Sequence, residues 1–306
     1  MQNNSLRTRV YVDGYNFYYG CLKGTSFKWL DLVKLFEEQI LPSILIPNQS
    51  NPPVLAFHDP AVKFFTAKII ERAARSTDSV SSQARYHTAL RKTHGQRLEL
   101  IEGYYAINEA KAKLIDAEDP KKWPRDCSEA PYWKLEEKQS DVNLALNLYH
   151  DALTGEIDHA VVVTNDTDVA PAMKFVRSNT NVIVGLIVPS CDNTRKPNTA
   201  LTDLAHWVRR SVTEKELLKS QLPRVVQGGK RPTSKPVSWY PRPDLLKPAL
   251  ELATQVLGTK VKAFKWLGER NERFNGETPL GLLESNAGAR KVMKYMGTYI
   301  ENIAKD

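Results

Sequence analysis

Acidic residues stand where predicted strands end or a predicted helix begins, and of the side chains in this 306-residue chain they are the best suited to chemistry. Parallel strands bring their carboxyl ends to one edge of a sheet, so side chains that follow such strands meet in one crevice. Carboxylates that share a crevice repel one another unless a cation lies between them. Oxygen ligands favour Mg²⁺ or Mn²⁺, which polarise a phosphoryl oxygen and generate hydroxide from bound water. The acids are Asp13, Asp141, Asp166 and Asp168, with Asn16 shortly after the first.

The same four acids also have a local explanation. Asp is favoured in turns and at helix N-caps, because its carboxylate accepts backbone N–H groups. Asp13-Gly14 is a common turn pair, Asp141 opens a predicted helix, and Asp166 and Asp168 precede another. Spacing alone does not distinguish a metal site from a set of caps, so both interpretations stay open.

Aromatic residues lie directly beside Asp13, at Tyr15, Phe17, Tyr18 and Tyr19. They are interpreted either as core and wall packing or as a stacking platform for unpaired bases. No G-x-G-x-x-G, G-x-x-x-x-G-K-[ST] or G-x-S-x-G motif occurs, so dinucleotide, P-loop and nucleophile-elbow sites lack support. The six His are scattered, and the three Cys have no disulfide or zinc spacing.

The elements that must position the acids alternate between strand and helix. Apolar and β-branched runs predict strands over 9–12, 53–57, 98–105, 158–164 and 181–188. Apolar spacing predicts helices over 30–40, 61–75, 80–93, 141–153, 169–177, 201–209 and 214–219. The stretch 108–139 is polar, carries three prolines and is interpreted as a long excursion. The alternation predicts an α/β fold with a mainly parallel sheet flanked by helices.

A second unit is expected after a linker. The segment 227–236 is rich in Gly, Pro and charge, and only helices are predicted after it, over 243–257, 260–271, 278–284 and 286–303. Thr278-Pro279 is an N-cap followed by Pro at the first helical position. We therefore predict an α/β domain over 1–223, a linker over 224–240 and a small all-α domain over 241–306.

Composition and charge narrow the class of protein. Hydrophobic residues make 42% and charged residues 25% of the chain, as in globular proteins. The longest apolar run, 182–188, is far short of a membrane span, and the polar N-terminus has no signal-peptide core, so a cytoplasmic protein is expected. Most of the net charge of +8 lies from Arg224 onward, where 15 Lys and Arg face 8 Asp and Glu. This surplus suits a polyanionic partner or simply a solvated surface.

Three motifs together resemble the NYN domain family of PIN-like ribonucleases, over about residues 6–223. They are Val10-Tyr-Val-Asp-Gly-Tyr-Asn-Phe17, Glu137-Lys138 with Asp141-Val-Asn-Leu-Ala-Leu146, and Val161-Val-Val-Thr-Asn-Asp-Thr-Asp168. The resemblance implies a PIN-like fold, a bound Mg²⁺ or Mn²⁺ and hydrolysis of RNA. By position it implies metal-binding and catalytic roles for Asp13, Asp141, Asp166 and Asp168, with Asn16 as a polar orienter. Expected substrate contacts are Lys138, Tyr15, Thr164 and Asn165.

The tail resembles the toxin-binding C-terminal domain of Xre–ParS-type antitoxins, over about 243–303. The matching residues are Phe264-Lys-Trp-Leu267, Phe274-Asn-Gly-Glu-Thr-Pro-Leu280, Leu282-Leu283 and Ala287-Gly-Ala-Arg290 with Val292. In that family the N-terminal partner is usually a helix-turn-helix DNA binder, whereas a nuclease-like domain precedes the tail here. The resemblance implies self-association or docking onto another protein.

Three functions are compared. The leading hypothesis is a Mg²⁺- or Mn²⁺-dependent endoribonuclease with RNA as its partner. The second is a non-catalytic module that binds RNA or protein within a toxin–antitoxin or defence locus. The third is a pyridine-ring hydroxylase of the 6-hydroxy-3-succinoylpyridine type, an activity of nicotine degradation described for some chains with this nuclease-like domain. It would need a flavin or a similar oxygen-activating cofactor.

Overall fold

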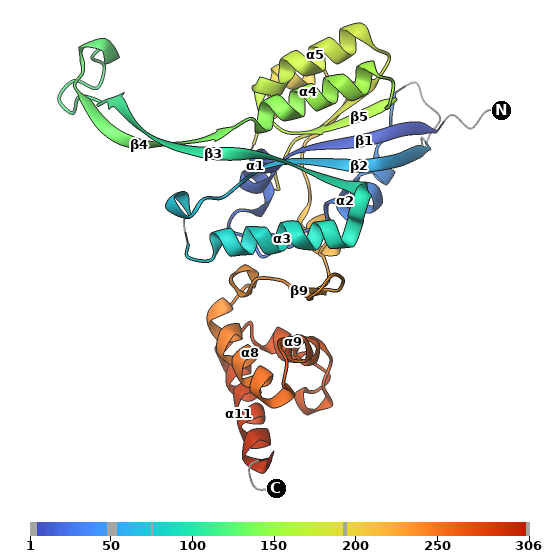
Figure 1. Cartoon of the computed structure of the whole chain (residues 1–306), viewed down its shortest axis with the longest axis vertical. Helices are drawn as coiled ribbons and strands as arrows, with labels where there is room; N and C mark the ends of the chain where they lie inside the picture. The colour runs from blue at the N-terminus through green and yellow to red at the C-terminus, as the bar shows by residue number, and fades with distance from the viewer. Residues whose placement is uncertain (1–4, 48–53, 75, 192–194, 304–306) are drawn as a thin grey trace.

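The computed structural model describes residues 5–47, 54–74, 76–191 and 195–303, in a mixed α/β unit followed by a helical unit (Figure 1). Within these residues seven strands form one sheet in the order β4-β3-β2-β1-β5-β6-β7. Each neighbouring pair is parallel except β3 with β4. The predicted α/β fold with a mainly parallel sheet is therefore confirmed. The strands are β1 (Leu6–Asp13), β2 (Leu55–Lys68), β3 (Leu98–Lys113), β4 (Glu129–Lys138), β5 (His159–Val163), β6 (Ile183–Ile187) and β7 (Trp207–Arg209).

Helices cover both faces of the sheet, α3 on one side and α4 with α5 on the other (Figure 1). Strand β1 feeds both layers because successive side chains point to opposite faces. Val10 and Val12 pack in one core, and Tyr11 packs in the other with Leu144. The helices of this unit are α1 (Gly14–Phe17), α2 (Leu32–Lys34), α3 (Ser79–His94), α4 (Ser140–Leu153), α5 (Ala170–Asn179), α6 (Thr199–Thr202) and α7 (Glu214–Lys219).

The helix predicted over 61–75 is wrong. Residues 61–67 belong to β2, which lies between β1 and β3, so that Val62 is paired with both Val10 and Leu98. The run is buried on both faces of the sheet, and its apolar spacing therefore fits a buried strand as well as a helix. The central place in the sheet, which is set by distant partners, decides between the two.

The helix predicted over 201–209 is also wrong in its second half. Helix α6 ends at Thr202, and Trp207–Arg209 forms β7 against β6. The indole of Trp207 lies over Gly185 of β6, where a Cβ atom would meet the ring at 2.0 Å. A glycine in the neighbouring strand therefore gives this tryptophan its place.

The polar excursion forms a long antiparallel ribbon. Residues 104–113 of β3 pair with 129–138 of β4, and the ribbon extends away from the body of the protein (Figure 1, green). Its inner end carries Tyr105 opposite Glu137, and its outer end is exposed on both faces. The inner end of the ribbon therefore lies at the body of the protein, and its outer end packs against no hydrophobic core in the part of the chain that the structure describes.

The tail is helical, as predicted. Leu267, Leu283 and Val292 are buried in one apolar cluster, against which Trp266 and Leu280 pack. The N-cap at Thr278 is present, since its hydroxyl accepts the N–H of Gly281 at 3.1 Å. The helices are α8 (Pro243–Leu257), α9 (Lys260–Gly268), α10 (Pro279–Leu282) and α11 (Asn286–Ile303).

The segment expected to be a linker, 224–240, is a packed connection. It contains the short hairpin of β8 (Val225–Val226) and β9 (Thr233–Ser234). Lys92 of α3 donates to the carbonyl of Arg231 at 2.5 Å, and Trp239 packs on Trp29 with ring centroids 6.1 Å apart. The helical unit is thus joined to the sheet unit through an ordered segment (Figure 1).

Candidate active site

The candidate site lies where the strand order reverses. From β1 the sheet continues to β2 on one side and to β5 on the other, and both pairs are parallel. Ligands in open α/β sheets bind at such a switch point, beyond the carboxyl ends of the strands. Val12 of β1 is paired with Val163 of β5. Asp13 and Thr164 therefore leave the sheet side by side.

Asp13 is held in place from two sides. One carboxylate oxygen accepts the N–H of Asn16 at 2.9 Å, and the other accepts the hydroxyl of Thr164 at 2.7 Å. The Thr164 hydroxyl in turn accepts the N–H of Asp166 at 3.0 Å. Asp13 is only 4% exposed, and burial raises its pKa to about 6 against the opposing effect of these hydrogen bonds, with Asp141 and Glu137 adding repulsion. The cap of α1 and the acid of the site are thus one residue.

The other predicted acids lie close enough to act on one another. Asp141, in the first turn of α4, is half-buried, and its pKa is raised by burial and then by Asp166, Glu137 and Asp168. Asp166 is half-buried and accepts the N–H of Asp168 at 3.1 Å, while Asp168 is exposed. These carboxylates therefore lie near one another, and their roles as ligands stay a prediction.

The acids do not form a compact ligand set. Among the residues that the structure describes, the three-residue group whose ligand atoms all lie within 4.8 Å of one another is found elsewhere, at His150, Asp151 and Glu156. The four predicted acids therefore stand further apart than one direct coordination sphere. Binding of a divalent cation by them stays a prediction.

A fifth acid, Glu137, completes the acidic end of the sheet. It comes from the inner end of β4, where it accepts hydrogen bonds from Ser140 and, at 3.3 Å, from the hydroxyl of Tyr105. Burial raises the pKa of Tyr105, which keeps this hydroxyl protonated and able to donate. The sequence signal for Glu137 was its place next to Lys138, but its arrival at the site depends on the register of the ribbon.

Lys138 points the other way. Successive side chains of a strand alternate between faces, so Lys138 shares a face with Glu136 rather than with Glu137. Its ammonium pairs with Glu136 at 3.0 Å. The predicted substrate contact at Lys138 thus lies on the face of β4 opposite the fifth acid.

The remaining predicted contacts mostly organise the site. The amide of Asn165 donates to the carbonyl of Lys196 at 3.1 Å and accepts the N–H of Asn198 at 2.9 Å, so it anchors the loop after β6. That loop carries Arg195, whose guanidinium donates to the side chain of Asn16 at 3.3 Å. Sequence reasoning missed Arg195, a cation beside Asn16 that no local motif marks.

The aromatic residues after β1 divide between wall and core. Phe17 is 1% exposed and packs with Phe36 in the core. Tyr15 is 48% exposed, and its ring centroid lies 4.5 Å from that of Tyr19. Lys23 lies 4.8 Å from the centroid of the Tyr19 ring. The site therefore has an aromatic wall next to its acidic end.

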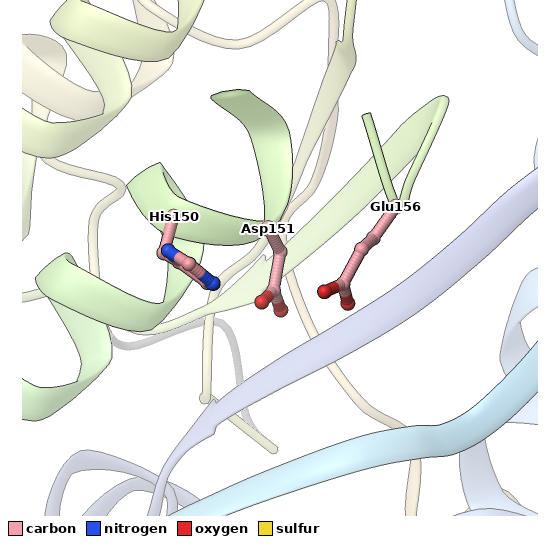
Figure 2. A group of neighbouring side chains, drawn as sticks. All are labelled: His150, Asp151 and Glu156. Carbon is pink, nitrogen blue, oxygen red and sulfur yellow. The ribbon is translucent and has the colours of Figure 1, made fainter. Parts of the chain in front are cut away.

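Two members of the compact group drawn in Figure 2, Asp151 and Glu156, belong to an ion network. Asp151 is buried and pairs with Arg9 at 2.7 Å and with Lys63 at 2.8 Å. Glu156 pairs with the same guanidinium at 2.8 Å. Two cations already neutralise these carboxylates, which leaves a third cation without an electrostatic reason to bind. The network instead ties β1 and β2 to the end of α4.

Comparison with known families identifies both parts of the chain. The model of the NYN domain matches residues 7–207. The chain belongs to the NYN domain family. The model described as the antitoxin Xre/MbcA/ParS C-terminal toxin-binding domain matches residues 252–299. Both resemblances drawn from the sequence are confirmed.

A curated relative covers nearly the whole chain. It is the 6-hydroxy-3-succinoylpyridine 3-monooxygenase HspA of Pseudomonas putida (strain S16), 54% identical over 303 residues, which are 98% of this chain and 96% of that protein. A solved structure, that of the Vibrio parahaemolyticus protein of unknown function VPA0982, covers 70% of this chain and 97% of its own, at 14% identity and a TM-score of 0.36.

The relative overturns the leading functional hypothesis. The prediction of a metal-dependent ribonuclease is wrong, because the near full-length relative with both domains is named a monooxygenase, as in the third alternative. Carboxylates at the end of a sheet serve more than one kind of reaction, because function belongs to the site and not to the fold. The described part of the chain contains no helix that is long and apolar enough to cross a membrane.

Proposed function

We propose that this chain is a monooxygenase that places one oxygen atom on a hydroxypyridine ring of the 6-hydroxy-3-succinoylpyridine type. The single observation that carries the proposal is the 54% identity to HspA over 98% of the chain. Identity at this level extends through the sheet unit, the connecting segment and the helical unit. If the two proteins shared only one domain, the identity would be confined to that domain and would support the shared activity less.

The chemistry of such a ring suits a carboxylate base. In a 6-hydroxypyridine the oxygen on C6 and the carbon C3 are para to each other, so loss of the hydroxyl proton raises the electron density at C3. Oxygen placed at C3 displaces the succinoyl group from that carbon: the bond between C3 and the acyl carbon breaks, and the side chain leaves as an aldehyde with a second pair of electrons from the donor. Asp141 is half-buried and has a raised pKa, which brings its proton affinity closer to neutral pH. We assign Asp141 as the group that accepts the ring hydroxyl proton.

Two neighbouring features fit the rest of the substrate. The exposed ring of Tyr15, which contacts Tyr19 at a tilt of 42°, offers a flat surface for a pyridine ring. Arg195 lies near Asn16, and a guanidinium binds carboxylates in bidentate fashion, as the succinoyl tail requires. In this proposal Asp13, buried and doubly hydrogen-bonded, positions the acidic end rather than touching the ring.

The switch point does not fit a flavin dinucleotide. A pyrophosphate there needs a glycine-rich turn and free N–H groups at a helix N-terminus. In this chain the N–H of Asn16 is taken by the carboxylate of Asp13, which would repel a phosphate. No step is assigned to a flavin at this site.

A divalent cation fits the donor set better. Carboxylate oxygens suit Mg²⁺ or Mn²⁺, and the raised pKa values of Asp13 and Asp141 reflect burial and repulsion that a cation would oppose. Asp13, Asp166 and Asp168 are the residues proposed to hold it, directly or through water, while Asp141 stays unligated and able to accept the ring proton. Such an ion would act as a Lewis acid toward the oxygen atoms of the substrate.

The test is incorporation of oxygen into the substrate. A monooxygenase reduces the second atom of O₂ to water with two electrons from a donor, so 6-hydroxy-3-succinoylpyridine is incubated with ¹⁸O₂ and NADH, with Mn²⁺ or EDTA. One ¹⁸O atom in the product, at a rate about 100-fold lower for Asp141→Asn, is expected. Asp203→Asn, an exposed acid of the same type, serves as the matched control. Failure to incorporate ¹⁸O under all conditions would refute the proposed activity.

The helical unit supports a separate proposal about partners. Its family description names toxin binding, and the apolar stripe of the unit is already buried within it. We propose that its outer surface contacts a protein, either a second copy or another chain. Light scattering of the purified protein tests the second copy, and a strictly monomeric chain at all concentrations would leave only the heterologous partner.

A further inference from the structure

A cavity of about 440 Å³ lies between the sheet unit and the helical unit. This volume is within the range of small-molecule sites, ~300–1,000 Å³. Both units contribute to its apolar wall, together with the segment that connects them. The apolar lining residues include Leu218, Leu222, Leu246, Leu280 and Leu283, together with Trp29, which is fully buried. The cavity is separate from the carboxylate crevice, since none of the site acids lines it.

Two cations face each other at the edge of this cavity. Lys235 donates its backbone N–H to the carbonyl of Arg224 at 2.8 Å, one step beyond the β8–β9 pair of Val225 with Ser234. Residues directly opposite in an antiparallel pair project from the same face, and like charges in such a pair destabilise it. Arg224 and Lys235 both line the cavity. The fold therefore brings two positive side chains together at one side of an apolar space.

No carboxylate of the described chain pairs with either cation. The ammonium of Lys235 donates to the carbonyl of Ser26 at 2.9 Å and lies 4.9 Å from the centroid of the Tyr240 ring. Burial, followed by repulsion from Arg224 and Lys28, lowers the pKa of Lys235 to about 8. The positive charge here is thus costly in the empty protein, and an anion would relieve that cost.

The other charged groups of the lining do not supply the anion. Arg242 is bonded to Asp244, with a shortest contact of 2.6 Å. Glu284 is exposed and forms no ion pair with the lining cations within the residues the structure describes. The lining also includes two residues with a buried polar atom that has no hydrogen-bond partner, the hydroxyl of Tyr240 and Oε1 of Gln221. These two polar atoms could therefore form hydrogen bonds with a molecule bound in the cavity.

We propose that this cavity binds a small organic anion, with a carboxylate or phosphate group held between Arg224 and Lys235 and a flat apolar body against the leucines of the lining. The site is distinct from the carboxylate crevice and does not depend on the proposed oxygenation. Because the cavity is lined by both units and by the segment joining them, its occupant fastens the helical unit to the sheet unit.

Calorimetric titration of the full chain tests the site with three probes up to 10 mM. Nicotinate carries a carboxylate on a flat ring, nicotinamide is its neutral counterpart, and inorganic phosphate is an anion without an apolar body. Nicotinate should bind at least about tenfold more tightly than nicotinamide, because a charge-assisted hydrogen bond is worth that factor or more. Phosphate should displace nicotinate only at higher concentration, because it lacks the apolar body, and displacement by an equal or lower concentration of phosphate would contradict the apolar part of the site.

Variants locate the binding. Lys235→Met and Arg224→Gln should each weaken nicotinate about tenfold or more, whereas Lys215→Met, an exposed lysine of α7 outside the lining, should leave it unchanged. Asp13→Asn should also bind nicotinate as the wild type does. Equal affinity for nicotinate and nicotinamide, absence of binding for both, or a loss confined to Asp13→Asn would overturn the proposal. Melting curves of each variant establish that it is folded.

Discussion

Replacing Asp13 by Asn should stabilise the folded protein at alkaline pH. The carboxylate of Asp13 is 4% exposed, and its pKa is raised from 3.8 to about 6. The folded state therefore binds the proton more tightly than the unfolded state, so stability falls as pH rises through this interval. The shift of about 2 pKa units, at ~1.36 kcal/mol each, corresponds to about 3 kcal/mol at pH 8. Asparagine carries no charge at any pH and escapes this cost.

The hydrogen bonds of the site decide how much of that gain appears. The N–H of Asn16 can still be accepted by the amide oxygen of the variant, and Thr164 can rotate to accept from its amide nitrogen. We therefore expect about 2–3 kcal/mol of added stability at pH 8 and about 2 kcal/mol less at pH 4.5, where the wild-type carboxyl is protonated in the folded state but largely ionised in the unfolded state. The variant should therefore gain most stability at the pH at which the buried carboxylate of the wild type is ionised.

Urea unfolding at the two pH values, in EDTA, measures this difference. EDTA is required because a bound cation would stabilise the ionised wild type and mask the effect. Asp203→Asn, on an exposed position, is the control and should not change the midpoint. Equal midpoints for Asp13→Asn and wild type at pH 8, or the same gain at both pH values, would refute the reasoning from burial.

Three further predictions concern charge in the fold. Burial lowers the pKa of His159 to about 4, so the unfolded state binds the proton more tightly and about 3 kcal/mol of stability should be lost as pH falls from 6.5 to 4. The variant His159→Asn should lose this pH dependence in urea unfolding, and an unchanged pH dependence would contradict the prediction. Asp151→Asn should cost about 3–5 kcal/mol by leaving Arg9 and Lys63 buried without their partner, and a cost below 1 kcal/mol in urea unfolding would contradict it. Mn²⁺ should raise the melting temperature of the wild type more than that of Asp166→Asn, and an equal rise in both would remove Asp166 from the metal site.

The part of the site carried by strand ends could be predicted from sequence. Asp13 and Asp166 follow short apolar runs, and the carboxyl ends of parallel strands meet by geometry, so their proximity needs no knowledge of distant contacts. Glu137 and Arg195 could not be placed in the same way. Glu137 reaches the site through the register of a ribbon that pairs it with Tyr105, and Arg195 through a loop anchored by Asn165.

The fold errors have the same origin. The segment 61–67 carries an apolar spacing that fits a helix, and only its pairing with β1 and β3 makes it a strand. The kind of reaction catalysed is even harder to predict from a sequence pattern than the fold. Carboxylates at the end of a sheet bind cations and move protons in many reactions, so the acids that suggested RNA hydrolysis are equally suited to deprotonating a ring hydroxyl.

The acidic residues of the site are carried by two kinds of structure, the buried strands of the sheet and the exposed ribbon of β3 and β4. Asp13 and Asp166 lie at the ends of buried strands, whereas Glu137 lies on a ribbon whose outer length is braced by its own pairing alone. A free two-stranded ribbon is marginally stable in water. Strand β3 continues without a break from the core to the outer end of the ribbon. Movement of that outer end would therefore displace Tyr105 and Glu137. Burial and then Asp166 raise the pKa of Asp141, and the smaller contribution of Glu137 depends on the position of this ribbon.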